Sequence, residues 1–274
     1  TYYIREVLPT TGCWVQTVPA IECYELVLGQ GPKAEPVRFG NWQPAKFRFF
    51  KYNDFDGDCV FDPGEEKLEG WRFKISGPYG AAATLETGPD GYTPYFTGPV
   101  GHYTVEECAP EGFPECWESC RENPFGIDVV ACTNPDIKVG NRFTANVTLK
   151  KFHDYDGDGI WDGDEPPIEG WRFDIKGPDG VVQTVFTNSS GIAKVKLGTH
   201  APPATTQYEI LEEEPIGWER TTPDVNPVIT DLAACDCKTF IFGNRFPRVI
   251  VCKFNDCNSN GVCDPEEPCL PGWE

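Results

Sequence analysis

The sequence predicts an all-β protein made of tandem β-sandwiches, and three observations lead to this prediction. Apolar residues alternate with polar ones, turns rich in Gly, Pro, Asn and Asp separate the apolar runs, and the pattern repeats about every 100 residues. Residues 172–198 show the alternation clearly, because they read as three strands joined by the turns GPDG and NSSG. Many short strands within one such repeat are typical of a β-sandwich.

An acidic segment marks each copy of the repeat. The copies are DFDGDCVFDPGE from Asp54, DYDGDGIWDGDE from Asp154 and DCNSNGVCDPEE from Asp256. Each follows a strand-like run that ends in Lys and precedes a Gly-Trp pair, at Trp71, Trp171 and Trp273. Trp71 and Trp171 are expected to fill the cores.

The same signatures divide the chain into four pieces. We expect the C-terminal part of a preceding repeat (1–41), two complete repeats (42–141 and 142–244) and the N-terminal part of a following repeat (245–274). The two partial pieces together would still lack a counterpart of 172–206. A window cut from a longer array is therefore expected, and exchange of strands between chains stays open.

The composition indicates an extracellular or cell-surface protein. Thirteen cysteines against three histidines point to disulfides and an oxidising compartment. A formal net charge of −20 argues against nucleic acids and anionic membranes as partners and favours cations. No apolar run approaches the roughly 20 residues of a membrane-spanning helix.

The acidic segments have the oxygen spacing of a twelve-residue calcium loop, with ligands at positions 1, 3, 5, 7, 9 and 12. Position 7 offers its backbone carbonyl oxygen, and a glycine at position 6 permits the sharp turn. The candidate Ca²⁺ ligands are Asp54, Asp56, Asp58, Val60, Asp62 and Glu65; Asp154, Asp156, Asp158, Ile160, Asp162 and Glu165; and Asp256, Asn258, Asn260, Val262, Asp264 and Glu267.

Two alternatives stand beside calcium. Magnesium demands tighter octahedral geometry, and a solvated acidic turn would bind nothing. In the first loop Cys59 replaces the glycine of position 6, which puts the geometry of that loop in question. Because the flanks are strand-like, the ion is expected to clamp strands together rather than to act as a switch.

The run LKKFHDYDGDGIWDGDEPPIEGWRFDIKGPDG, followed by YEILEEEPIGW and FGN, resembles the SdrD B-like repeat domain of bacterial and archaeal surface proteins. It is similar, more distantly, to the Cna-type B domain. The resemblance covers nearly the whole chain. It implies tandem immunoglobulin-like or prealbumin-like β-sandwiches that bind calcium and are stacked as stalks of adhesins, surface-layer-associated proteins or fibres. Such proteins are not usually enzymes. The cysteine content departs from the family pattern and suggests extra covalent crosslinks.

Three kinds of polar residue fall on the apolar side of their strands. Lys51 and Lys151 follow the parity of apolar neighbours, as Lys253 follows Val249 and Val251. The Cna-type resemblance implies that Lys and Asn condense to an isopeptide bond with Glu as catalyst. The matching sets are Lys51, Glu107 and Asn141; Lys151, Glu212 and Asn244; Glu6 and Asn41 of the preceding repeat; and Lys253 of the following one. Alternatively, these residues lie solvated at strand ends, with Asn serving a turn.

The cysteine positions leave the disulfide connectivity open. Cys13 and Cys23 flank one hairpin and are candidates to bridge it. Either Cys59 or Cys108 is a candidate for the odd thiol.

Two functions follow. The first is a structural segment of an extracellular fibre or stalk that associates with itself or continues the array. The second is an adhesin that binds a host protein or glycan, with the aromatic-rich segment 111–134 as the candidate loop. An enzyme is not expected, because no nucleophile motif or phosphate loop is present.

Overall fold

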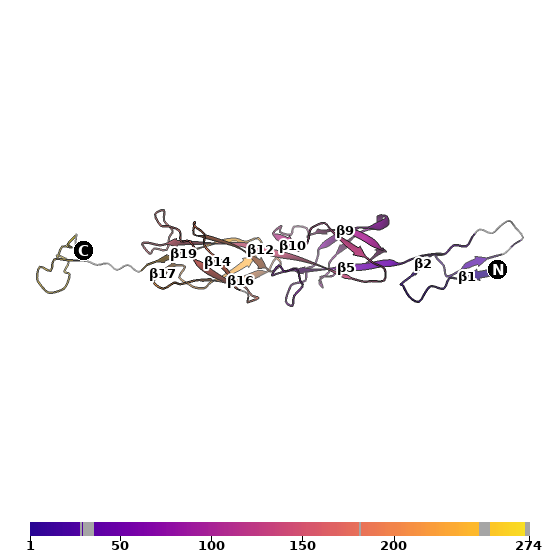
Figure 1. Ribbon diagram of the computed structural model, residues 1–274, viewed down its shortest axis with the longest axis horizontal. Helices are drawn as coiled ribbons and strands as arrows, with labels where there is room; N and C mark the ends of the chain where they lie inside the picture. Colours follow the sequence, from indigo (N-terminus) through magenta and orange to yellow (C-terminus); the bar gives the residue numbers. More distant parts are fainter. Residues whose placement is uncertain (28, 30–35, 181, 247–252, 272–274) are drawn as a thin grey trace.

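The computed structural model describes residues 1–27, 29, 36–180, 182–246 and 253–271. The all-β prediction is confirmed: within these ranges the chain forms strands and a single 3₁₀ turn, η1 (Pro78–Gly80). The described residues contain no helix long and apolar enough to cross a membrane. Two β-sandwiches follow one another along the long axis of the molecule (Figure 1). The third Gly-Trp pair and residues 249 and 251 lie outside the described residues.

The first sandwich packs two sheets around an aromatic core. One sheet has the order β11-β9-β6-β7, and the other contains β5, β8, β10 and the first part of β12. The core includes Phe47, Phe49, Trp71, Phe73 and Tyr103, each with no exposed surface. The strands are β5 (Pro44–Asn53), β6 (Arg72–Ser76), β7 (Ala82–Glu86), β8 (Phe96–Pro99), β9 (Gly101–Cys108), β10 (Trp117–Ser119), β11 (Phe125–Val129) and β12 (Asp136–His153).

The second sandwich repeats this arrangement with fewer aromatic residues. Its sheet β14-β13-β16-β18 faces β17, β19, β15 and the second part of β12. Phe173, Ile210, Leu232 and Phe242 form its centre. The predicted strands within 172–198 are confirmed as the first three of the following: β13 (Arg172–Lys176), β14 (Val182–Phe186), β15 (Ile192–Thr199), β16 (Thr205–Glu212), β17 (Glu219–Thr222), β18 (Val228–Ala233) and β19 (Cys237–Arg245).

Strand β12 belongs to both sandwiches. Its residues 136–141 pair in parallel with β5, and its residues 146–153 pair in parallel with β19. Val139 and Phe143 enter the first core, while Ala145, Val147 and Leu149 enter the second. All five have odd numbers, so one face of the strand points inward along its length. The sandwiches are therefore joined by continuous backbone without a linker.

Two disulfides join successive repeats. Cys13 bonds Cys132, and Cys116 bonds Cys235, each pair 119 residues apart. The predicted bridge between Cys13 and Cys23 is wrong, because Cys13 reaches forward into the first sandwich and Cys23 keeps a free thiol. Both cross-repeat bonds start from a Cys-Trp pair, so the same disulfide link between successive repeats occurs twice.

The terminal pieces are smaller. The described residues between 1 and 42 form two two-stranded sheets, and residues 253–271 form an acidic loop closed by a bridge between Phe254 and Cys269. The N-terminal strands are β1 (Tyr2–Ile4), β2 (Val15–Val18), β3 (Tyr24–Leu26) and β4 (Gly40–Trp42).

Candidate metal loops and buried lysine clusters

The first aspartate of each acidic loop organises the loop backbone. Asp54 Oδ1 accepts a hydrogen bond from Gly57 N at 3.1 Å, and its Oδ2 accepts one from Cys59 N at 3.1 Å. Asp154 makes the same two bonds, to Gly157 N at 2.6 Å and Gly159 N at 2.8 Å. Asp54 and Asp154 are 1% and 0% exposed. The twelve-residue segments therefore fold around their first carboxylate.

The glutamate at position 12 closes the loop. Glu65 accepts hydrogen bonds from Phe55 N at 2.8 Å and Asp62 N at 3.0 Å. Glu165 accepts the equivalent bonds from Tyr155 N at 2.7 Å and Asp162 N at 3.1 Å. Burial raises the pKa of Glu65. The hydrogen bonds from the Asp62 and Phe55 amides oppose this effect, and the charges of Asp54 and Asp56 add to it. A cation would relieve this repulsion.

The predicted ligand carboxylates converge in both complete loops. In the first loop one oxygen each from Asp54, Asp56 and Glu65 lies within 4.8 Å of the others, and Asp56, Asp58 and Asp62 form a second such group. The second loop repeats both groups, with Asp154, Asp156 and Glu165, then Asp156, Asp158 and Asp162. Two overlapping groups of hard oxygen donors fit Ca²⁺, which takes six to eight oxygen ligands.

The third loop keeps the backbone pattern with amide side chains. Asp256 accepts from Asn260 N and Gly261 N, and Glu267 accepts from Cys257 N at 2.8 Å. Asn258 and Asn260 each donate to Asp264 Oδ2, at 2.8 and 2.9 Å. The side chains of Val60, Ile160 and Val262 at position 7 are exposed, which suits residues expected to offer only a carbonyl oxygen.

Cys59 does not distort the first loop. Its φ of +66° lies in the left-handed region beside those of Gly159 (+80°) and Gly261 (+75°). The backbone of position 6 is thus shared by all three loops.

The first loop lies at the joint between the sandwiches. Glu66 Oε2 accepts a hydrogen bond from Ala201 N at 2.7 Å, and its Oε1 lies 3.1 Å from His200 Nδ1. Asn53 donates to the Thr199 carbonyl oxygen at 2.9 Å. An ion held by this loop would stiffen the joint as well as the sandwich.

Lys51, Glu107 and Asn141 meet inside the first sandwich. Lys51 Nζ lies 2.8 Å from Glu107 Oε1, and both side chains are fully buried. Asn141 Nδ2 donates to the same oxygen at 2.9 Å, and Lys51 also donates to the Val139 carbonyl oxygen at 3.1 Å. The Lys51 ammonium faces the ring of Trp71, 4.7 Å from its centroid.

The second sandwich repeats the cluster with a different contact. Lys151 Nζ donates directly to Asn244 Oδ1 at 2.8 Å, and Glu212 Oε1 lies 3.4 Å from Lys151 Nζ. The Glu212 contact lacks hydrogen-bond geometry, so it is an electrostatic one. Among the described residues no hydrogen-bond partner faces Asn244 Nδ2. Trp171 covers Lys151 at 4.4 Å.

Burial weakens the charged forms in these clusters. Desolvation lowers the pKa of Lys51 and of Lys151 to about 8, although Glu107 and Glu212 act in the opposite direction. Desolvation likewise raises the pKa of Glu212 against the pull of Lys151. In the second cluster the two effects favour a neutral amine beside a protonated acid.

Only part of the cluster is present in each terminal piece. Asn41 Nδ2 donates to Glu6 Oε1 at 2.7 Å in the N-terminal piece, while Lys253 belongs to the C-terminal piece.

Sequence reasoning missed that the two tryptophans also face the buried lysines. The Gly-Trp pair after each acidic loop was the available signal.

No family model matches the sequence, and no curated protein matches it. Solved structures with a similar fold are the Bacillus anthracis TIE protein, a minor pilin of Streptococcus agalactiae and a streptococcal ancillary pilin. Their identities are 17%, 13% and 18%, with TM-scores of 0.42, 0.30 and 0.31. The matches cover 76%, 76% and 90% of this chain and 37%, 99% and 75% of those chains. The chain thus spans about a third of the length of the TIE protein, and the likeness is one of fold.

Proposed function

We propose that this chain is a structural segment of an extracellular, surface-attached fibre or stalk. In it, calcium, disulfides and Lys–Asn isopeptide bonds rigidify repeated SdrD B-like sandwiches. The observation that carries the proposal is the junction: a single strand, β12, serves two cores, and a disulfide crosses the same boundary. This geometry suits a partner that is another copy of the chain or a further repeat of the same array.

Calcium supplies charge neutralisation to the loops. The residues that would hold it are those named above, with Asp54 or Asp154 nearest the core and Glu65 or Glu165 closing the loop. Because each loop follows the first strand of its sandwich and lies near the last, a bound ion ties the two ends of one repeat together.

The lysine clusters supply the covalent bond. The neutral Lys151 amine attacks Asn244 Cγ, so that a bond forms between Nζ and Cγ while the bond from Cγ to Nδ2 breaks. Protonated Glu212 polarises the carboxamide and gives its proton to the departing nitrogen. The carboxylate so formed then takes up a proton from the former amine, which restores the acid. The products are one secondary amide and one ammonia, with no external reactant. Lys51, Glu107 and Asn141 would react in the same way.

Mass spectrometry of the reduced, denatured protein tests this step. The mass should fall short of the sequence mass by one ammonia for each bond, and digestion should yield a branched peptide joining Lys151 to Asn244. Glu212→Gln should abolish that bond, whereas Glu213→Gln, at the exposed next position, should keep it. A full sequence mass for mature protein would refute the isopeptide part.

Electron microscopy of native material tests the fibre itself. Continuous filaments containing this chain are expected. Isolated rods that bind cells or glycans would favour the adhesin instead. The candidate adhesive segment 111–134 does not support that alternative, because Phe113, Trp117 and Phe125 pack on the first core.

A further inference from the structure

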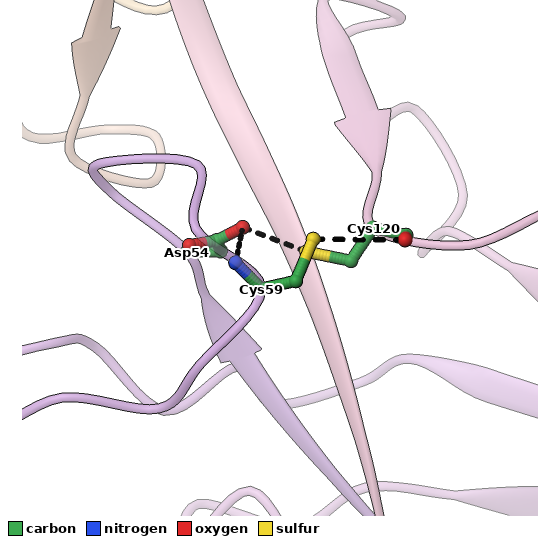
Figure 2. Close-up of side chains that lie close together, drawn as sticks. All are labelled: Asp54, Cys59 and Cys120. Atoms are coloured by element: carbon green, nitrogen blue, oxygen red, sulfur yellow. Dashed lines mark hydrogen bonds between the residues drawn. The ribbon is translucent and has the colours of Figure 1, made fainter.

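We infer that Cys59 and Cys120 form a third disulfide, which fastens the first acidic loop to the end of strand β10. Cys59 is at position 6 of that loop, and Cys120 directly follows β10. The Cys59 thiol points to the Cys120 carbonyl oxygen at 3.6 Å, and the Cys120 thiol lies 2.7 Å from Asp54 Oδ2. Figure 2 shows the two side chains converging beside Asp54.

The two sulfur atoms are already close. Asp54, Cys59 and Cys120 each place one polar atom within 4.8 Å of the other two, although 61 residues separate the cysteines in sequence. A disulfide would bring the two sulfur atoms from within 4.8 Å to about 2.05 Å.

The second sandwich provides an internal comparison. Gly159 stands where the first loop has Cys59, and Thr221 stands where β10 is followed by Cys120. The match follows from the strand pairing, because Ser119 pairs with Asn141 as Arg220 pairs with Asn244. Both positions are cysteine in one repeat and neither is in the other, as a bonded pair requires.

Backbone conformation adds a second argument. A side chain in the left-handed region costs roughly 1 kcal/mol compared with glycine. Loops two and three have glycine at this position, with φ of +80° and +75°. The first loop has cysteine in the same conformation. A disulfide from this side chain would explain why cysteine stands there in place of the less strained glycine. Cys13–Cys132 and Cys116–Cys235 show that the fold already accommodates disulfides.

The reaction is a thiol–disulfide exchange with an external disulfide, such as an oxidised dithiol oxidoreductase or oxidised glutathione. The S–S bond forms between Cys59 and Cys120, and both S–H bonds break. The external disulfide accepts two electrons and two protons and leaves as two thiols. The hydrogen that Cys120 donates to Asp54 Oδ2 is lost, and that oxygen then keeps its hydrogen bond from Cys59 N.

Differential alkylation tests the bond. The protein is equilibrated in a glutathione redox buffer and then denatured in the presence of a first maleimide, which labels free thiols. It is then reduced, and the newly released thiols are labelled with a second, isotopically distinct maleimide. Cys59 and Cys120 should carry only the second label and should appear in one crosslinked peptide before reduction. Cys108, whose thiol contacts Glu106 at 3.8 Å, should carry the first label and serves as the internal control.

Two variants copy the second sandwich and should therefore fold. In Cys59→Gly, Cys120 should take the first label, and in Cys120→Thr, Cys59 should do so; Cys108→Ser should leave the pair protected. First-label modification of both residues in the wild-type protein would overturn the inference, as would a bond from either to another cysteine. Protection that a chelator removes without reductant would also overturn it, since it would identify a metal held by Asp54 and the two thiols.

Discussion

The disulfides shorten the covalent route through the molecule, and reducing them should change its stretched length by an amount that depends on the isopeptide bonds. Along the backbone, Cys13 and Cys235 are 222 residues apart. With both bridges intact, the route passes from Cys13 to Cys132, runs back 16 residues to Cys116, and crosses to Cys235. Reduction therefore releases 206 residues, about 720 Å at roughly 3.5 Å per residue.

The proposed isopeptide bonds change this value. If Lys51 is bonded to Asn141 and Lys151 to Asn244, the reduced route from Cys13 to Asn244 uses only residues 13–51 and 141–151, a total of 48 steps. The oxidised route then runs from Cys132 to Lys151, which is 19 steps. The difference of 29 steps is about 100 Å.

Single-molecule force spectroscopy with handles at both chain ends measures this difference. Mature protein is stretched fully before and after addition of reductant, and Cys108→Ser is the matched control. An increase near 100 Å supports the complete crosslink set, and one near 720 Å supports disulfides alone. An oxidised molecule that already extends by several hundred ångströms would refute the crosslink topology.

Three further outcomes are expected. Chelator should lower the melting temperature by about 10 °C, since an ion present at a hundredfold its Kd contributes about 2.7 kcal/mol per site; an unchanged calorimetric transition would count against the calcium clamp. Bond formation between Lys151 and Asn244, followed by mass spectrometry in protein refolded from denaturant at different pH, should be fastest between pH 7 and 8. The neutral amine becomes more abundant as pH rises through its lowered pKa of about 8, whereas protonated Glu212 becomes scarcer as pH rises through its raised pKa of about 7; a rate that climbs steadily to pH 10 would exclude the acid role. Glu66→Ala should broaden the spin-label distance distribution between the two sandwiches, because it removes the contacts to Ala201 and His200, while exposed Glu69→Ala should leave that distribution narrow.

Much of the fold and the local geometry of the site could be predicted from sequence, because both depend on short periodicities. Alternation placed Lys51 beside Phe47 and Phe49 on an inward face. In the structure Lys51 contacts Glu107, which also accepts a hydrogen bond from Asn141. The loop spacing likewise identified carboxylates that converge on one another.

The pairing of cysteines could not be predicted in the same way. A separation of 119 residues exceeds one repeat, so the Cys116–Cys235 bond depends on how successive sandwiches abut. That placement is set by β12 and by joint contacts such as Asn53 to Thr199, which no periodicity reveals. From sequence alone, Cys59 is only a departure from the glycine pattern of the calcium loop, because its proposed partner Cys120 follows strand β10, far away in the sequence.

Because one strand runs unbroken through two cores, no hinge separates the two sandwiches. Every strand carries a right-handed twist, so the angle between neighbouring sandwiches about the long axis is fixed by the backbone of β12. In an assembly that repeats this junction, each sandwich would be turned by the same amount relative to the last. Surface groups at equivalent positions would then follow a regular helix around the shaft. The pitch of that helix would be set by the twist of the eighteen-residue strand β12.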